Sequence, residues 1–413
     1  MSATPPRGAG PLARREARLA WGLLLPTLSA VALVVVLPLL AVFWISVKPV
    51  GLADLRPPAP VVNEQLRGSP EAPGDAATLR YRLRNSSQEV TIRDVTLTDA
   101  WPAGLTPVAM DPRCTLSGAV LSCDLGDWPG GHRDEVAIEV SVGAAFLDAG
   151  ADPRASAPEM TGRAPNVLTS REFTGENFAR VFDGREFWAV LGATLFYTVF
   201  GTFGALMVGL FAALLLNRSF RGKGILRGLY LFPYVAPVIA VAFAWLILFD
   251  PFAGSANALL IRMGVSEGAI NFFGERPLAL IMVTLFEVWR YFPLSFLFIL
   301  ARMQSIDQDM YEAADMDGAS PFQKFRYLSL PQLAGILSVL FLLRFIWTFN
   351  KFDDIFLLTG GNAGTRTLTV NVYEQAFAVS NIGAGAAVAV LIFAALLVFS
   401  LLFLRYVSRE EGL

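Results

Sequence analysis

Long apolar runs constrain the fold of this chain more than any other feature of its 413 residues. A helix needs about 20 predominantly apolar residues to cross the hydrocarbon core of a bilayer. Six segments meet this requirement, at roughly 19–46, 186–217, 229–250, 277–303, 331–358 and 384–406. Composition agrees, because 54% of the residues are hydrophobic and only 16% are charged. The sequence therefore predicts an all-α membrane protein with six transmembrane helices.

Basic residues gather on alternate connectors between these segments. They are Arg7, Arg14, Arg15 and Arg18, then Arg218, Arg221, Lys223 and Arg227, then Lys324 and Arg326, and finally Arg405 and Arg409. By the positive-inside rule these connectors are cytoplasmic, and so are both termini. The alternative of a cleaved signal peptide at the start is weak, because the first apolar run is too long and ends near Trp44 without a small-residue cleavage site.

Residues 48–170 are then an extracytoplasmic insert between residues 1–47, which hold the first helix, and a membrane domain at 171–413. Apolar residues of the insert alternate with polar ones, as at Leu79, Tyr81 and Leu83. This period of two predicts an antiparallel β-sandwich at about 74–146, with less ordered linkers on both sides. The stretch "RNSSQEVTIRDVTLTDAWPAGL" also resembles Ig-like repeat modules of bacterial surface proteins, and the resemblance implies a sandwich but no activity.

The two cysteines of the chain, Cys114 and Cys123, both lie in this insert. They would face each other across a hairpin if residues 117–120 form its loop, and an oxidising compartment would let them form a disulfide. Two reduced cysteines in the core of the sandwich are the alternative.

Sequence motifs for catalysis are absent. Neither "RGKGILRG" nor "GGNAGTRT" has the Lys and Ser or Thr that follow the glycines of a Walker phosphate loop. His132 stands beside "PGG", which favours a turn residue over a base or a metal ligand. We therefore expect no catalytic site, no metal, no cofactor and no nucleic-acid partner in this chain.

The connector "YEAADMDGASPFQKFRYLSLPQL", residues 311–333, carries more helix signals than a simple loop needs. Ser305 and Gln308 have capping-box spacing, which predicts a helix over 306–316 that Gly318 ends in a left-handed conformation.

A second helix is predicted to begin directly after Gly318. Ser320, Pro321 and Gln323 supply its cap, its first-turn proline and its box partner. The pair Leu330–Pro331 is expected to be extended before the next span.

The first of these helices has an apolar face of Met310, Ala313 and Ala314 and an acidic face of Asp309, Glu312 and Asp315. A solvated charged face would explain the acids but not two capped helices in a connector, so the pattern favours a docking element.

The same stretch resembles the EAA loop of permease subunits from binding-protein-dependent ABC importers. The motif positions are Glu312, Ala313, Ala314, Asp315, Gly318, Leu330 and Pro331. The stretches "VWRYFPLSFLF" and "FNKFDDIFLLTGG" are similar to those of the sugar-importer branch, maltose- and trehalose-type permeases above all. The resemblance covers about 171–406 and the first span.

This resemblance implies a type I ABC importer permease fold in a bacterial inner membrane, with the EAA loop at 304–331 seated in a cleft of a separate ATPase that binds ATP and Mg²⁺. The implied partners are a second permease subunit, a dimer of ATPase subunits, an extracytoplasmic solute-binding protein and a sugar. The alternatives are another solute such as glycerol phosphate, or a membrane-anchored sensor or adhesion protein built on the β domain.

Ionisable side chains inside the apolar segments suggest a solute pathway, because such groups usually face a cavity or a partner. The candidates share one helical face within each segment: Glu287, Arg290 and Tyr291 in the fourth, and Trp347, Asn350, Lys351 and Asp354 in the fifth. The alternative is that Glu287 with Arg290, and Lys351 with Asp354, are buried structural pairs. Pro233 and Pro237 are expected to kink the third segment.

Overall fold

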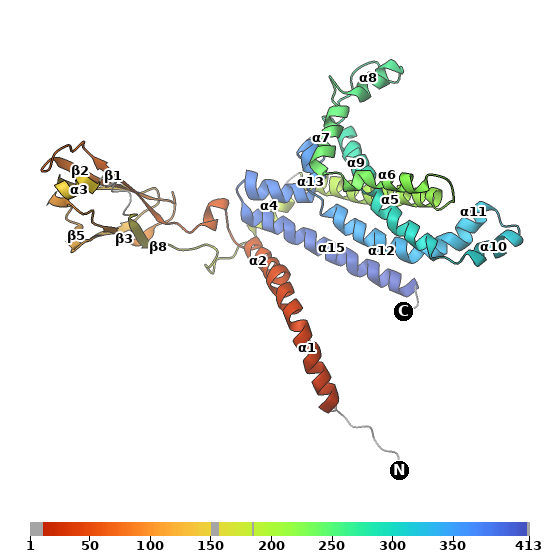
Figure 1. The fold of residues 1–413 in the computed structure, drawn as a ribbon, viewed down its shortest axis with the longest axis horizontal. Helices are drawn as coiled ribbons and strands as arrows, with labels where there is room; N and C mark the ends of the chain where they lie inside the picture. Colours follow the sequence, from red (N-terminus) through yellow and green to blue (C-terminus); the bar gives the residue numbers. More distant parts are fainter. Residues whose placement is uncertain (1–10, 150–156, 184–185, 411–413) are drawn as a thin grey trace, which may run out of the picture. The chain divides into compact units, whose positions relative to one another are not determined.

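The computed structural model describes residues 11–149, 157–183 and 186–410 (Figure 1). Arg7 lies outside the described residues, as do the side chains of Arg14 and Arg409. The chain divides into two compact units, and we call Met1–Val47 with Thr174–Leu413 the helical unit and Lys48–Phe173 the β unit. The β unit is thus inserted into a helical unit that begins before it and resumes after it.

The helical unit consists of α-helices joined by short connections and by three π-helical turns. In chain order its elements are α1 (Pro11–Val31), η1 (Ala32–Val36), α2 (Leu37–Ser46), α4 (Glu176–Asp183), α5 (Phe187–Leu216), α6 (Lys223–Val235), α7 (Val238–Leu248), α8 (Ser255–Arg262), α9 (Leu278–Gln304), α10 (Gln308–Met316), α11 (Pro321–Lys324), η4 (Phe325–Ser329), α12 (Leu330–Phe349), α13 (Asp353–Thr359), α14 (Leu368–Tyr373), η5 (Glu374–Ala378) and α15 (Ile382–Glu410).

Five of the described helices are long and apolar enough to cross a membrane: Arg15–Ser46, Phe187–Leu216, Leu278–Gln304, Pro321–Phe349 and Ile382–Val407. The predicted span at 229–250 is two helices, α6 and α7, which meet at an angle of 92°. Pro237 explains the break, since it cannot donate to the ladder and biases Ala236 to its extended ψ of 142°. The broken pair counts as a sixth span if it crosses as one.

Small residues bring α5 and α9 close together. A Cβ added at Gly204 would lie 2.6 Å from Val288 Cγ2, and one added at Gly209 would lie 2.7 Å from Ser295 Cβ. Glycines of this kind let helix backbones approach inside a membrane, where packing replaces the hydrophobic effect as the force that holds helices together. The pair forms the centre of the unit, around buried residues such as Phe286 and Phe296.

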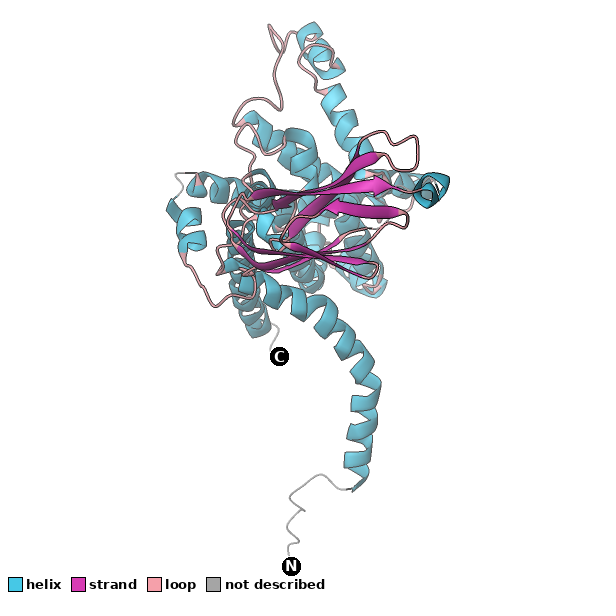
Figure 2. Ribbon diagram, turned by 90° about the vertical axis from the view of Figure 1, so that its left-hand side faces the viewer, coloured by secondary structure: helices cyan, strands magenta, loops and turns pink. Residues whose placement is uncertain are grey.

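The β unit is a sandwich of two four-stranded sheets, drawn in magenta in Figure 2. Its elements are η2 (Leu52–Leu55), β1 (Pro60–Arg67), β2 (Ala76–Asn85), β3 (Ile92–Ala100), β4 (Leu105–Ala109), β5 (Cys114–Ser117), β6 (Val120–Trp128), β7 (Arg133–Val142), α3 (Ala144–Ala149) and β8 (Glu159–Arg163). The strand orders are β1-β2-β7-β4 and β5-β6-β3-β8, and all neighbouring strands in these orders are antiparallel.

The sandwich is larger than the predicted range of about 74–146, because β1 and β8 lie outside that range. A charged residue obscures the alternation in β1, where Glu64 is buried between the inward-facing Val62 and Leu66. Strand β8 is only five residues long and carries one apolar anchor, Met160. Neither strand has the repeated apolar period by which β2 and β7 are recognised.

The two cysteines are directly opposite each other in the β5–β6 hairpin, whose turn is formed by Gly118 and Ala119. Gly118 has a φ of +64°, which a tight hairpin turn requires and which glycine adopts without strain. The sulfurs of Cys114 and Cys123 form a disulfide in the structure.

Candidate functional site

The connector between α9 and α12 is a folded element, which we call the coupling loop (residues 305–329). Its first helix, α10, begins after Asp307, whose carboxylate accepts from the Asp309 N–H at 3.1 Å. The predicted cap at Ser305 is wrong, because the Ser305 hydroxyl donates to the Arg302 carbonyl at 2.8 Å and completes α9. Asp307 is better placed because it is the residue with extended backbone, which an N-cap requires.

The left-handed turn at Gly318 is confirmed, with a φ of +74°. The N–H groups of Gly318 and Ala319 donate to the carbonyls of Asp315 and Ala314, which satisfies the free carbonyls at the end of α10. The capping box of α11 is confirmed as well. Ser320 Oγ accepts from the Gln323 N–H at 3.3 Å, and Gln323 Oε1 accepts from the Ser320 N–H at 2.7 Å.

The expectation of an extended Leu330–Pro331 pair is wrong. Leu330 is helical, with φ of −62° and ψ of −43°, and the helix continues from η4 into α12. Its N–H donates to the carbonyl of Phe325, five residues earlier. The wider π turn makes room for the ring of Pro331 just before that residue, so the proline is absorbed without a break.

The coupling loop exposes both charge and apolar surface. No residue of α10 is buried, and Glu312, Ala313 and Asp315 are among its exposed residues. The side chains of Met316, Phe322 and Tyr327 are 89%, 72% and 72% exposed. Exposed large apolar groups among charged and polar residues are typical of protein interaction sites.

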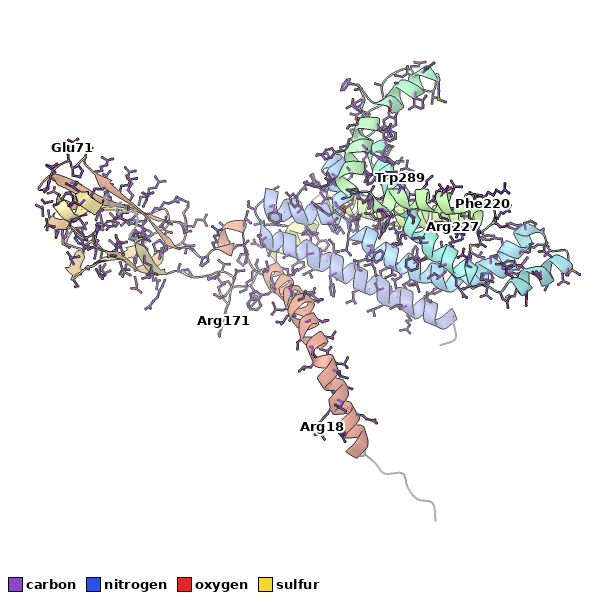
Figure 3. The ribbon with its side chains drawn as sticks, viewed as in Figure 1. Arg18, Glu71, Arg171, Phe220, Arg227 and Trp289 are labelled. Carbon is purple, nitrogen blue, oxygen red and sulfur yellow. A yellow bond between two sulfur atoms is a disulfide. The ribbon has the colours of Figure 1, made fainter. Side chains whose placement is uncertain are left out.

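Two contacts give the loop a defined shape. Tyr311 Oη and Ser329 Oγ are 2.9 Å apart, which ties α10 to η4. Lys324 Nζ lies 2.6 Å from Asp315 Oδ1, which ties α11 to α10. At the same end of the helical unit, Arg227 donates to the Leu216 carbonyl at 2.8 Å and joins α6 to the end of α5 (Figures 1 and 3).

A buried ion pair lies between α9 and α12. Glu287 is 1% exposed, and its Oε1 accepts from Arg344 Nη2 at 2.7 Å and from Thr348 at 3.0 Å. Its Oε2 accepts from the Tyr197 hydroxyl at 3.0 Å. A Cβ at Gly201 would lie 3.0 Å from the Glu287 side chain, so the glycine makes room for it.

The buried pair of Glu287 with Arg290, which the sequence offered as an alternative, does not form. Arg290 instead donates to the carbonyls of Pro233 and Ala236 at 3.1 and 3.0 Å, where α6 breaks from α7. The Pro233 carbonyl would normally accept from the residue four positions later, which is Pro237 and has no N–H. Arg290 therefore replaces a backbone donor that the sequence cannot supply.

The predicted stripe on the fifth span is wrong, because α12 ends at Phe349 and α13 begins at Asp353. Lys351 lies in the turn between them. Its ammonium donates to the Tyr291 hydroxyl and lies 3.4 Å from Asp353 and 3.9 Å from the fully buried Asp354. Tyr291 therefore joins the fourth and fifth spans.

Three cations surround the Tyr291 ring. Lys351 Nζ lies 4.3 Å from its centroid, and the guanidinium carbons of Arg344 and Arg290 lie 4.9 and 5.6 Å from it. Tyr234 adds an edge contact, with the two ring centroids 6.1 Å apart. Arg344 was missed by sequence reasoning, although a single arginine in the apolar run "FLLRFIW" was a signal that could have found it.

The two other pathway candidates, Trp347 and Asn350, are exposed and make none of these contacts with Tyr291. Trp347 is 52% exposed. Asn350 is exposed at the end of α12, where its amide donates to the Ile346 carbonyl at 2.9 Å. It lines a largely apolar hollow of about 570 Å³ between α12, α14 and α15, together with Thr369, Val372 and Phe393.

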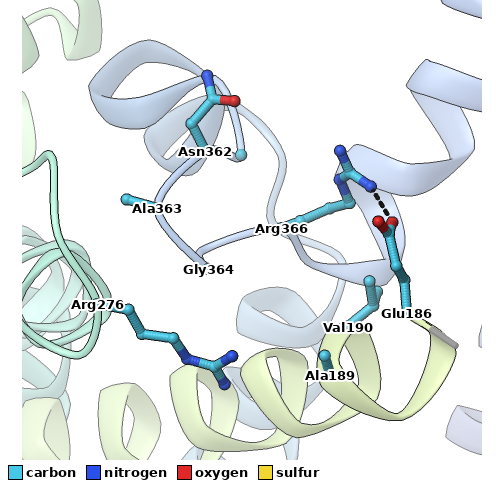
Figure 4. Close-up of a pocket in the computed structure, with 9 residues that line it drawn as sticks. Glu186, Ala189, Val190, Arg276, Asn362, Ala363, Gly364 and Arg366 are labelled. Atoms are coloured by element: carbon cyan, nitrogen blue, oxygen red, sulfur yellow. Dashed lines mark hydrogen bonds and ion pairs between the residues drawn. The ribbon is translucent and has the colours of Figure 1, made fainter.

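A second hollow, of about 300 Å³, lies beside the glycine-rich loop at 360–366 (Figure 4). Arg366 on one side of it lies 2.6 Å from Glu186 and 2.9 Å from Glu374. Arg276 reaches it from the opposite side, and a Cβ at Gly364 would lie 2.7 Å from the Arg276 side chain. Ala363 has a φ of +53° in this loop, a conformation that few residues other than glycine adopt.

The part of the chain that the structure describes holds no group of three or more His, Cys, Asp or Glu side chains suited to a metal ion.

Known proteins resemble the helical unit. The family model described as "Binding-protein-dependent transport system inner membrane component" matches residues 205–411. The inner membrane ABC transporter permease protein YcjO of Escherichia coli is 36% identical over 242 residues, which are 58% of this chain and 80% of that protein. The trehalose/maltose transport system permease protein MalF of Thermococcus litoralis is 33% identical over 245 residues, 59% of this chain and 82% of that protein.

A more distant relative and a solved structure agree with these matches. The sn-glycerol-3-phosphate transport system permease protein UgpA of Yersinia pestis is 32% identical over 246 residues, 58% of this chain and 82% of that protein. A crystal structure of a bacterial alginate ABC transporter, in complex with an alginate pentasaccharide-bound periplasmic protein, has a chain that superposes with a TM-score of 0.54 at 18% identity. The match covers 58% of this chain and 83% of that one and shows a shared fold.

The matched region contains α6 to α15 and with them the coupling loop, the Glu287–Arg344 pair and the Tyr291 cluster. The chain therefore belongs to the family of binding-protein-dependent transport system inner membrane components, the permease subunits of ABC transporters.

Proposed function

We propose that this chain is one permease subunit of an ATP-driven importer that moves a sugar, a di- or oligosaccharide such as maltose or trehalose, into a bacterial cell. One relative supports this class of solute, since it is named for trehalose and maltose. Another is named for glycerol phosphate, which is the alternative solute. A second permease subunit and a dimer of ATPase subunits complete the transporter. ATP and Mg²⁺ bind to the ATPase, and this chain contributes no cofactor.

The coupling loop is the observation that carries the proposal. It has two capped helices, a defined shape and exposed side chains of Met316, Phe322 and Tyr327. A separate ATPase that receives α10 in a cleft would bury this apolar surface. When the ATPase closes on ATP, it would move α10 and, through η4 and the continuous α12, tilt the membrane helices between outward and inward access.

The orientation follows from the basic connectors. Arg218 and Arg221 precede α6 and Lys223 begins it, whereas Lys324 and Arg326 follow α10, so we place this end of the helical unit in the cytoplasm. Both chain termini are then cytoplasmic, and the β unit is extracytoplasmic. A solute-binding protein would deliver the sugar on that outer side.

The solute pathway is proposed to pass the Tyr291 cluster. Tyr291 offers an aromatic face and Lys351 a donor at the junction of α12 and α13, and Trp347 offers exposed aromatic area one turn earlier. Sugar rings bind to aromatic faces and to a few polar groups that fix their hydroxyls. The three cations around Tyr291 favour a phosphorylated polyol as the second candidate solute.

The coupling proposal is tested with Gly318→Val. A Cβ at Gly318 meets no atom within 4 Å, so the substitution acts only by forcing a β-branched residue into a left-handed conformation. Gly224→Val is the matched control, because Gly224 has equal space and is inside a helix. We expect Gly318→Val alone to weaken co-purification with the ATPase and solute-stimulated ATP hydrolysis. Normal values for both would contradict the proposal.

Charge on α10 is tested with a second pair of variants. Glu312 is exposed, so neither change should affect folding. If the acidic face meets basic groups of the ATPase, Glu312→Lys reduces ATP hydrolysis more than Glu312→Gln does. Equal effects would mean that charge at this position has no role in docking.

The pathway is tested by competition. Trp347→Ala removes exposed aromatic area, and Tyr291→Phe removes only the hydroxyl that accepts from Lys351. We expect both variants to insert normally but to change which unlabelled sugars compete for uptake. Competition by glycerol phosphate and not by disaccharides would select the second solute, and unchanged preference in both variants would remove the cluster from the pathway.

A further inference from the structure

The outward face of the sheet β1-β2-β7-β4 collects arginines at one end. Alternation along β2 buries Leu79, Tyr81 and Leu83 and turns Arg82 and Arg84 outward. In the antiparallel register, Arg84 is paired directly with Arg133 of β7. Like charges that face each other across two strands destabilise a sheet. This pairing therefore works against folding unless something else compensates it.

Neighbouring acids do not provide that compensation. Glu135, which is opposite Arg82 in the register, forms its ion pair with Arg80. Asp134 forms its ion pair with Arg113. Arg82, Arg84 and Arg133 are exposed, and none of them takes part in an ion pair with another described residue.

The cluster does not follow from a general excess of basic residues, because acids outnumber bases between residues 48 and 173. Local gathering of one charge in a domain of the opposite sign produces a field that attracts an anion.

The three arginines line a hollow of about 420 Å³ together with Val61 and Asn63 of β1, and Leu83, Asp134 and Glu135 line it as well. The two carboxylates of this lining are those held by Arg113 and Arg80. Ligand pockets of small molecules begin at about 300 Å³, so the hollow is large enough for one sugar ring and its substituents. Side chains of directly opposed residues start about 4.5–5.5 Å apart, and guanidinium forks bind carboxylate and phosphate oxygens in pairs. Asn63 adds an amide for hydroxyl groups, and Val61 adds an apolar wall.

We propose that this hollow binds an anionic sugar, a unit that carries a carboxylate or a phosphate, with Arg84 and Arg133 on the anionic group and Arg82 beside it. The site is in the β unit and is separate from any solute pathway in the helical unit. The proposal does not depend on which solute the transporter moves.

The test uses the full chain in nanodiscs of zwitterionic lipid, so that lipid charge does not compete. Isothermal titration calorimetry measures binding of trigalacturonate and of glucose 1-phosphate, with neutral maltotriose as the control ligand. The double variant Arg84→Gln with Arg133→Gln is compared with Arg67→Gln, an exposed arginine on β1 of the same sheet.

We expect at least one anionic probe to bind with an affinity that falls as salt rises, and maltotriose not to bind. Loss of two charged hydrogen-bonding groups should weaken that binding by roughly tenfold or more, while Arg67→Gln leaves it unchanged. Binding of both anionic probes supports a site for the anionic group, and binding of one identifies the group. Absence of binding by both, equal binding of maltotriose, or equal loss in Arg67→Gln would overturn the proposal.

A folding control separates binding from structure. Because the double variant relieves repulsion between exposed side chains, its thermal unfolding should be unchanged or slightly improved. If it unfolds earlier, the charge-preserving variant Arg84→Lys with Arg133→Lys decides. Partial retention of anion binding in a folded lysine variant supports the site. Anion binding that is as strong in both double variants as in the unaltered chain overturns the proposal.

Discussion

Removal of the Glu287 carboxylate is the sharpest perturbation of the helical unit. Glu287→Met keeps much of the side-chain volume but leaves Arg344, which is 3% exposed, without its counter-charge. It also removes the acceptor of the Tyr197 hydroxyl, which is buried. Breaking a buried ion pair by loss of one partner costs about 3–5 kcal/mol. At about 2–4 °C per kcal/mol for a unit of this size, the midpoint of thermal unfolding should fall by about 6–20 °C.

A double variant and a surface pair make the measurement decisive. Glu287→Met with Arg344→Met removes both charges, and replacement of a whole buried pair by apolar groups is often neutral, so most of the stability should return. Lys324→Met breaks an ion pair of similar length, 2.6 against 2.7 Å, in which Asp315 is 59% exposed. Such exposed pairs contribute at most about 1 kcal/mol.

Thermal unfolding of the purified protein in detergent, followed by tryptophan fluorescence, gives all three values. The reasoning is refuted if Glu287→Met destabilises no more than Lys324→Met, or if the double variant is no more stable than Glu287→Met alone.

Three further predictions concern packing, acid and the disulfide. Gly209→Leu should prevent close approach of α5 and α9 and lower the yield of folded protein in size-exclusion chromatography, whereas Gly192→Leu, on the same helix with no atom within 4 Å of its Cβ, should not. Hydrogen bonds from Arg113 hold the pKa of Asp111 below its usual range, so this contribution to β-unit stability is present above about pH 3.9 and is lost as the pH falls through the folded pKa. Asp111→Asn should therefore unfold earlier at neutral pH, by at most about 1 kcal/mol, and show a flatter acid dependence in a proteolysis assay; an unchanged profile would contradict this. The two cysteines of the β5–β6 hairpin should resist thiol labelling in native membranes until a reductant is added, and labelling without one would show that they are free.

The helix ends in the coupling loop could be predicted from the sequence, because the residues that cap a helix lie within four positions of each other. Gly318 and the Ser320–Gln323 box were placed correctly, since a left-handed glycine and a capping box need no distant partner. The choice between Ser305 and Asp307 as the first cap could not be made in this way. It depends on where α9 ends, and α9 uses the Ser305 hydroxyl itself.

Pairings across helices could not be predicted, because they depend on which helices are neighbours. Spacing along α9 suggested that Glu287 pairs with Arg290, whereas Glu287 meets Arg344 of α12 and Arg290 meets the break after α6. The proline that makes this break was visible, but the carbonyl that it leaves without a donor becomes apparent only when α9 is placed beside α6.

The end of the fifth span and the position of strand β1 were also predicted wrongly, again because they depend on tertiary contacts. The predicted fifth span continues past Phe349 because Trp347, Asn350, Lys351 and Asp354 repeat at helical spacing. In the structure α12 ends before Lys351, and the ammonium of Lys351 contacts the Tyr291 hydroxyl on α9. This tertiary contact stabilises a turn where the sequence predicts a continuous helix. Strand β1 was missed because Glu64 interrupts its apolar pattern, although the strand pairs with β2 along its full length.

Reconstituted transport tests the central claim most directly. The chain is assembled with its partner permease, the ATPase and the solute-binding protein in proteoliposomes, and uptake of radiolabelled maltose or trehalose is measured with ATP supplied on the ATPase side. We predict uptake that requires both ATP and the binding protein, that continues in the Gly224→Val assembly and that is lost in the Gly318→Val assembly. Uptake that proceeds without ATP, or that is equal in the two assemblies, would contradict coupling through this loop.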